Sequence, residues 1–119
     1  ISNVNSLYQT FFNAYAFKNP HINGWNTGKV TQMQETFSGA RAFNGDLNGW
    51  NTGKVTIMED TFRGAWVFDK PLNGWDVSSV TNMNLMFAMA KEFNRDLNRW
   101  VTTAVTTMEQ MFSGGKCNI

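Results

Sequence analysis

Large apolar residues recur along this chain at a fixed interval. Trp25, Trp50, Trp75 and Trp100 fall 25 residues apart, and columns of valine, methionine and phenylalanine keep the same spacing. A constant period of this length is typical of repeat proteins, in which successive units stack and bury one continuous core. The columns expected to face inward are Ile22/Leu47/Leu72/Leu97, Val30/Val55/Val80/Val105, Met33/Met58/Met83/Met108, Phe37/Phe62/Phe87/Phe112 and Phe43/Phe68/Phe93, with the small residues Ala40/Ala65/Ala90/Gly115 beside them.

The pattern inside each unit predicts one short strand and one short helix. Val-Thr-x-Met alternates and begins with a β-branched residue, which indicates a strand. From Met58 to Phe68 the apolar spacing changes to threes and fours, which suits one or two helical turns. Leu-Asn-Gly-Trp would be a second short strand or an extended turn, and the Gly, Asn and Asp residues would form the corners. The pattern therefore predicts an α/β repeat, a right-handed solenoid of about four to five coils.

One domain, 1–119, should hold all of these units. The first partial coil leads its counterpart by 26 residues, so one residue is inserted between Phe17 and Trp25. The chain begins mid-coil without methionine and stops where the next phenylalanine is due. Since repeat arrays need covered ends, we expect a part of a longer protein, or ends covered by another chain. The expected units are a partial coil 1–24, coils 25–49, 50–74 and 75–99, and a partial coil 100–119.

Two columns are expected to form ladders along the stack. The tryptophans would stack as rings in the core. The asparagines at the corners would bond to neighbouring backbone and to one another, which predicts a buried role rather than that of surface turn residues. The ladder residues are Trp25, Trp50, Trp75, Trp100, Asn23, Asn48, Asn73 and Asn98.

Composition narrows the functional class. A hydrophobic content of 42% argues against disorder, and a net charge of +1 gives no reason to expect a nucleic-acid partner. No apolar run approaches the roughly 20 residues of a membrane span, so we expect no transmembrane segment in this chain. The single cysteine, Cys117, excludes an internal disulfide.

Candidate chemistry is sparse. The only histidine, His21, lies in the insertion beside Pro20 and is expected to be a solvated loop residue rather than a base. Cys117 has no second ligand for a metal site, and its role stays open between burial and intermolecular pairing. We therefore expect no enzyme, no metal and no cofactor.

Two polar arrays have ordinary explanations. Asp46, Asp69 and Asp96 lie near one corner, where turn formation explains them better than a calcium site would. The threonine column that contains Thr31 could suggest an ice-binding face, but an outward threonine on a strand is common.

The unit Phe-Asn-Gly-Asp-Leu-Asn-Gly-Trp-Asn-Thr-Gly-Lys-Val-Thr-x-Met-x-x-x-Phe-x-Gly-Ala resembles the repeat of BspA-like surface proteins. The same repeat occurs in mycoplasma surface lipoproteins as a domain of unknown function. The resemblance covers residues 4–117. It implies a leucine-rich-repeat-like solenoid and a role in adhesion or protein contact, extracellular or at a cell surface. It implies no catalytic residues. The few coils and the methionine-rich helices depart from the family pattern.

Positions where the copies differ are the best candidates for binding. Trp66 interrupts a basic column, and it is either an interface anchor or a ring that lies on its own neighbours. Leu85 and Met89 replace polar and glycine residues on one predicted helical face. Cations nearby, such as Arg63 and Arg95, either solvate a face or meet an acidic partner. The candidate partner contacts are Trp66, Leu85, Met89, Ile57, Arg63 and Lys91.

These features predict a non-enzymatic protein–protein interaction or adhesion module, whose partner would be a surface ligand or a neighbouring subunit. The alternative is a structural or linker subunit inside a large assembly, for example an organellar or algal membrane complex. In that case the chain would lie in an organelle, peripheral to the membrane complex.

Overall fold

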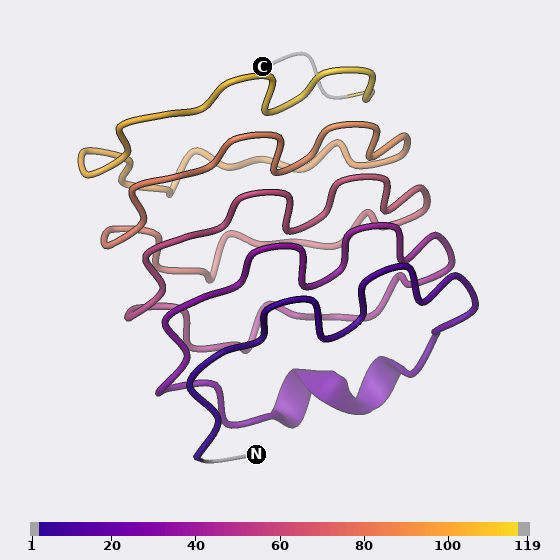
Figure 1. Cartoon of the computed structure of the whole chain (residues 1–119), viewed down its shortest axis with the longest axis horizontal. Helices are drawn as coiled ribbons and strands as arrows, with labels where there is room; N and C mark the ends of the chain where they lie inside the picture. Colours follow the sequence, from indigo (N-terminus) through magenta and orange to yellow (C-terminus); the bar gives the residue numbers. More distant parts are fainter. Residues whose placement is uncertain (1–2, 117–119) are drawn as a thin grey trace.

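The computed structural model describes residues 3–116, which wind into coils stacked one on another, with the two termini at opposite ends of the stack (Figure 1). Parallel bridges join each coil to the next at equivalent positions. The bridging residues fall 25 apart, except for the first step of 26, which reflects the inserted residue. The bridges are Ser6–Gln32, Gln32–Ile57, Ile57–Asn82 and Asn82–Thr107.

The prediction of an α/β repeat with short strands and short helices is wrong. Within residues 3–116 the single helix is η1, a 3-10 helix at Pro20–Gly24, which lies at the lower end of the stack in Figure 1. Pairing between coils is confined to the isolated bridges, so the described residues form no sheet. The protein is therefore not an α/β solenoid, and it lacks the strands and helices of a leucine-rich-repeat solenoid.

The segment expected to be helical consists of successive turns instead. In a helix every amide would donate to the fourth residue before it, along the helix axis. Here alternate amides point across to the next coil, and those between them donate to the third residue before. In the second coil the amides of Met33, Glu35, Phe37 and Gly39 donate to the carbonyls of Ile57, Glu59, Thr61 and Arg63 at 2.8–3.0 Å, and those of Thr36, Ser38 and Ala40 donate to Met33, Glu35 and Phe37 at 3.0–3.3 Å.

Left-handed residues make these turns possible. Two positions in each coil, four residues apart, have positive φ. Glycine adopts this conformation without steric cost, whereas other L-residues are strained by about 1–2 kcal/mol. Turns of this kind also bring an apolar side chain inward every three or four residues, so the spacing imitates that of a helix. The left-handed pairs are Gln9/Asn13, Glu35/Gly39, Asp60/Gly64, Leu85/Met89 and Gln110/Gly114.

Aromatic columns run through the core from coil to coil. The rings of Phe37, Phe62 and Phe87 stack at centroid distances of 5.5 Å and within 3° of parallel. Trp50 and Trp75 stack at 6.4 Å. The indole Nε1 of Trp50 also donates to the carbonyl of Ile22 in the preceding coil at 2.8 Å. Each ring therefore adds both apolar burial and a satisfied polar group to the contact between coils.

The inserted residue is accommodated by η1. The Asn19 side chain accepts a hydrogen bond from the amide of His21 at 2.9 Å, and Pro20 starts the helix, where its missing N–H costs nothing. His21 is exposed, and Ile22 is buried in the core. The segment expected to be a solvated loop is thus one short 3-10 helix.

The asparagine column ties the corners together. The Oδ1 atoms of Asn23 and Asn48 accept from the amides of Gly49 and Gly74 at 2.9 and 2.7 Å. Asn48 also donates to Asn73 at 3.2 Å. This ladder lies near the surface, since Asn23 and Asn48 are half-buried, whereas Asn73 and Asn98 are exposed.

Threonine hydroxyls tie the coils from inside. Thr61 is fully buried, and its Oγ1 donates to the carbonyls of Met33 and Met58 at 3.0 and 2.7 Å. Thr27 and Thr52 are also buried, and their hydroxyls donate to the carbonyls of Asn51 and Asp76 in the following coils. The expectation of ordinary outward threonines therefore does not apply to these positions.

Candidate functional site

A trough of about 360 Å³ lies on the outer side of the turn segments. Its floor is made by Gly39 and Gly64, which occupy one left-handed column in neighbouring coils. The same column holds Asn13 in the coil before and Met89 in the coil after. The trough is lined by Phe12, Asn13, Glu35, Ser38, Gly39, Arg41, Asp60, Arg63, Gly64, Trp66 and Met89.

The missing side chains of the two glycines create this hollow. A Cβ at Gly64 would meet nothing closer than 3.7 Å, so the space above it is open. The side chains of Asn13 and Met89 close the two ends. Because the coils are separated by about 4.8 Å, the trough is roughly 14 Å long from Asn13 to Met89. That length accommodates about four residues of an extended chain.

One wall is a stack of aromatic and cationic side chains. The Arg41 guanidinium lies 4.6 Å from the ring centre of Tyr15 and 4.1 Å from that of Trp66. Lys91 Nζ lies 4.2 Å from the other face of Trp66. Trp66 is therefore held between two cations of neighbouring coils, and its ring offers an edge rather than a face. Cation–π contacts of this kind fix the ring and keep the wall rigid.

Carboxylates stand at the opposite wall. The Oδ1 atom of Asp60 is buried and has no hydrogen-bond partner among the described residues. Arg63 Nη1 lies 3.6 Å from it, an ion-pair distance that is too long for a hydrogen bond. Burial raises the pKa of the Asp60 carboxyl above its ordinary value of 3.8; Arg63 counters the rise, and Glu59 and Glu35 add to it. The trough thus holds a carboxylate whose charge is incompletely compensated.

The structure brings three of the six predicted contacts to this trough, namely Trp66, Arg63 and Met89. Lys91 lies outside the lining and packs on Trp66. Leu85 and Ile57 are half-buried and do not line the trough.

The predicted helical face that carried Leu85 and Met89 is wrong as a helix. The two residues are the left-handed positions of one turn pair, with φ of +55° and +56°. Met89 is 49% exposed, so a strained residue presents an apolar side chain at the end of the trough.

Sequence reasoning missed the acidic wall and the floor. Glu35, Asp60 and Arg41 lie in columns that were interpreted as polar surface. The signal that could have found them is the glycine column 39/64/114, which marks positive φ and an open surface.

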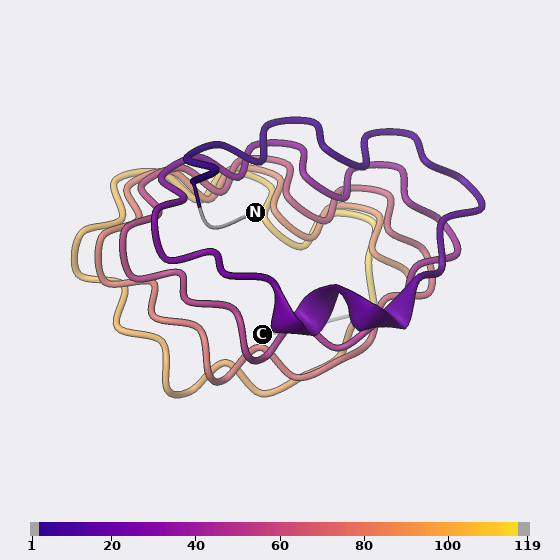
Figure 2. The same ribbon diagram turned by 90° about the horizontal axis from the view of Figure 1, so that it is seen from below.

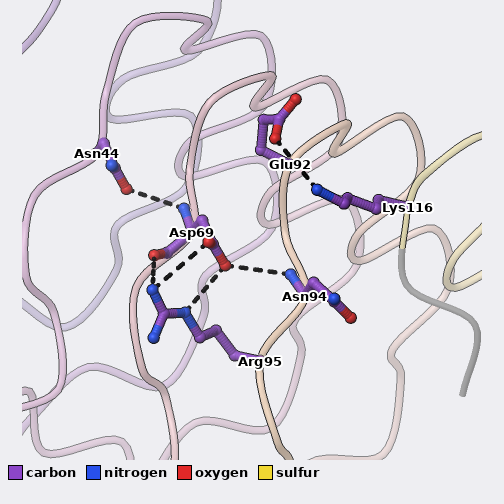
Figure 3. Close-up of polar contacts among 6 residues, drawn as sticks. All are labelled: Asn44, Asp69, Glu92, Asn94, Arg95 and Lys116. Atoms are coloured by element: carbon purple, nitrogen blue, oxygen red, sulfur yellow. Dashed lines mark hydrogen bonds and ion pairs between the residues drawn. The ribbon is translucent and has the colours of Figure 1, made fainter.

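Most other cations near the corners are already paired (Figure 3). Arg95 Nε donates to Asp69 Oδ1 at 3.0 Å, and Arg95 Nη2 donates to the Asp69 carbonyl at 2.9 Å. Lys116 Nζ lies 3.7 Å from Glu92 Oε2. Asp69 also links three coils, because its amide donates to Asn44 and its Oδ1 accepts from the amide of Asn94. These cations therefore join coils to one another.

The remaining chemical candidates serve turns. Asp46 and Asp96 each accept a hydrogen bond from the amide two residues later, at 2.9 and 2.7 Å. Within residues 3–116 no group of three or more His, Cys, Asp and Glu side chains is placed to hold a metal ion. Nor does any helix there have the length and apolar character to cross a membrane. Cys117 lies outside the described residues.

Comparison with known proteins matches one family over nearly the whole chain. The family of a mycoplasma protein of unknown function, DUF285, covers residues 1–118. Among curated proteins and among solved structures, nothing matches. The resemblance to a mycoplasma repeat of unknown function is thus confirmed, whereas the finer BspA-like assignment is not. The chain belongs to the DUF285 family of mycoplasma proteins of unknown function.

Proposed function

We propose that the protein is a non-enzymatic recognition module that binds an extended peptide segment of a partner protein in the trough over Gly39 and Gly64. The observation that carries this proposal is the open glycine floor beside an incompletely compensated carboxylate. The ligand class follows from the shape and the charge of the trough.

The shape favours an extended chain. The trough crosses neighbouring coils along the stack and is closed at its ends by Asn13 and Met89. Glycines on the floor let a peptide backbone approach the coil backbone closely. The Trp66 edge, the exposed Phe12 ring and the Met89 side chain supply apolar contacts. Aromatic and methionine side chains are common anchors at protein interfaces.

The charge favours a basic side chain in the bound segment. Glu35 and Asp60 line the trough, and Glu59 lies close enough to raise the pKa of Asp60. Arg41 already covers Trp66. A lysine or arginine from the partner would give Asp60 Oδ1 the partner it lacks and would relieve the repulsion among the acids. The bound segment should therefore carry a basic residue flanked by apolar ones.

Backbone strain at Met89 also supports a role in binding. Gly39, Gly64 and Gly114 hold the same left-handed position in other coils. Met89 takes this conformation at a cost and presents an exposed side chain at the trough. Strain of this kind is concentrated at binding and active sites.

A displayed library of random dodecapeptides, selected on the immobilised 119-residue chain, tests the proposal. We expect enrichment of peptides with Lys or Arg between apolar residues. A Gly64→Asn variant fills the trough, and its backbone is tolerated, because Asn13 adopts φ +55° in the same column. Gly114→Asn is the matched control: it makes the same change at the same left-handed position, outside the trough lining.

The selected peptides should lose binding to Gly64→Asn and keep it for Gly114→Asn. The proposal would be refuted if no peptide were enriched, or if the enriched peptides bound both variants as tightly as the wild type. Circular dichroism and thermal melts of both variants show that each remains folded.

Adhesion at a cell surface, of the BspA-like type, is the finer part of this proposal and is supported by the repeat unit alone. It does not include the leucine-rich-repeat architecture. The structural-subunit alternative is favoured by a different observation, the two open ends of the stack.

A further inference from the structure

The end coils repeat the bonding groups of the inner coils without their partners. Across the stack, alternate amides of each turn segment donate to carbonyls of the next coil, so the hydrogen bonds between coils have a direction. The last coil thus ends in donors, and the first coil ends in acceptors.

At the C-terminal end, four amides occupy the positions that donate in every earlier coil. In the preceding coil, their counterparts donate at 2.7–3.0 Å to Thr107, Glu109, Met111 and Ser113. The amides of the last coil have no backbone partner within residues 3–116. They belong to Met108, Gln110, Phe112 and Gly114.

At the N-terminal end, four carbonyls occupy the accepting positions. Their counterparts in the second coil, at Gln32, Gln34, Thr36 and Ser38, accept from the first coil at 2.8–3.1 Å. Across the part of the chain that the structure describes, the first-coil carbonyls accept no backbone hydrogen bond. They belong to Ser6, Tyr8, Thr10 and Phe12.

The threonine edge has the opposite direction and is complementary as well. Along it, Thr56 and Thr81 donate through their amides to the coil before. The Thr106 carbonyl at one end and the Asn5 amide at the other therefore match as acceptor and donor. The tryptophan column adds a further pair, since Trp100 Nε1 donates to Leu72 at 3.0 Å, which leaves Leu97 to receive an indole such as that of Trp25.

Apolar surface accompanies these groups. A hollow of about 440 Å³ at the C-terminal end is lined by Leu97, Asn98, Trp100, Thr102, Met108, Met111 and Phe112. At the other end Val4, Phe11, Phe17 and Trp25 are only partly buried. Helix η1 does not cover the accepting segment, because it lies on the opposite side of the first coil (Figure 2).

We infer that the C-terminal end of one copy of this chain stacks on the N-terminal end of a second copy. The second copy continues the phenylalanine and tryptophan columns, with Phe11 over Phe112 and Trp25 over Trp100. It also continues both sets of backbone hydrogen bonds in register. Because the two contacting surfaces differ, the contact does not close on itself, and it adds copies in a line.

Sedimentation of the 119-residue chain tests this inference. The average mass should rise steadily with concentration, up to about 1 mM, where weak contacts are populated. Met108→Lys places a lone charge in the C-terminal hollow, which should weaken association by about tenfold or more. Met89→Lys is the matched control, because Met89 is 49% and Met108 43% exposed, and Met89 lies on the outer side.

A mixing experiment tests the direction of stacking. Val4→Lys blocks the N-terminal end, so Val4→Lys and Met108→Lys should each be monomeric alone. Each retains the end that the other lacks, and an equimolar mixture should form dimers and nothing larger.

The inference is overturned if the wild type stays monomeric over the whole range, if Met89→Lys weakens association as much as Met108→Lys, or if the mixture forms no dimer. A readout on wild type alone covers a misfolded variant. The amides of residues 108, 110, 112 and 114 should exchange with solvent more slowly as concentration rises, and an unchanged rate contradicts the inference. The peptide-binding trough lies on a different surface, so either proposal can fail without the other.

Discussion

Replacing Gly64 by alanine should destabilise the protein, although the new methyl group has room. The nearest atoms to a Cβ at this position are Gly39 N at 3.7 Å and Gly39 Cα at 3.8 Å, which are ordinary contacts. The effect therefore comes from the backbone, whose φ is +68°. Alanine in this conformation costs about 1–2 kcal/mol, and the stiffer unfolded chain returns about 0.5–1 kcal/mol. The net loss should be about 0.5–1 kcal/mol.

A helix would give the opposite sign. Alanine stabilises a helix interior by about 0.5–1 kcal/mol relative to glycine. Gly24→Ala is the control, because no atom lies within 4 Å of its Cβ and its φ is not in the left-handed region. Urea melts at fixed temperature measure both variants. Gly64→Ala should lower the free energy of unfolding, and Gly24→Ala should leave it equal or raise it. A more stable Gly64→Ala would refute the turn assignment.

Three further predictions concern the core, the trough and the strained position. Trp50→Ala should lower the free energy of unfolding by about 3–5 kcal/mol in a chemical melt, more than Trp100→Ala, because Trp50 is 2% exposed and Trp100 is half-buried at the end of the stack; equal losses would contradict the core assignment. Asp60→Asn should stabilise the protein at pH 7, since folding raises the pKa of the Asp60 carboxyl and disfavours its charged form. That gain should fade as the pH falls through the raised pKa and then below 3.8, where both states of the wild type are protonated; a gain independent of pH would contradict the electrostatic cause. Met89→Gly should be more stable than Met89→Ala in the same melt, because φ is +56°, and the reverse order would contradict the strain.

The sequence period is sufficient to place residues in columns, but not to define the backbone that connects them. The offset of 26 in the first coil appears in the structure as the Ser6–Gln32 bridge. The helix prediction over Met58 to Phe68 failed because spacings of three and four arise equally from successive turns. Gly39, Gly64 and Gly114 were the available sign of left-handed turns, since glycine in a helix interior is unfavourable.

The candidate site was predictable only in part, for a related reason. Comparing copies singled out Trp66 and Met89, because each breaks a column. It could not identify Glu35 and Asp60, since acids in that column look like ordinary solvated surface. Their significance depends on burial and on the glycine floor between them, and both are properties of the folded stack.

The central claim is that the protein recognises an extended, basic peptide in the trough over Gly39 and Gly64. The most direct measurement is an NMR titration of the labelled 119-residue chain with one library-selected peptide. The account predicts that the largest shifts occur at the amides of Gly39 and Gly64 and at the Trp66 indole, and that Gly64→Asn abolishes them. Largest shifts at the last coil or along the threonine edge, with the trough residues unmoved, would contradict it.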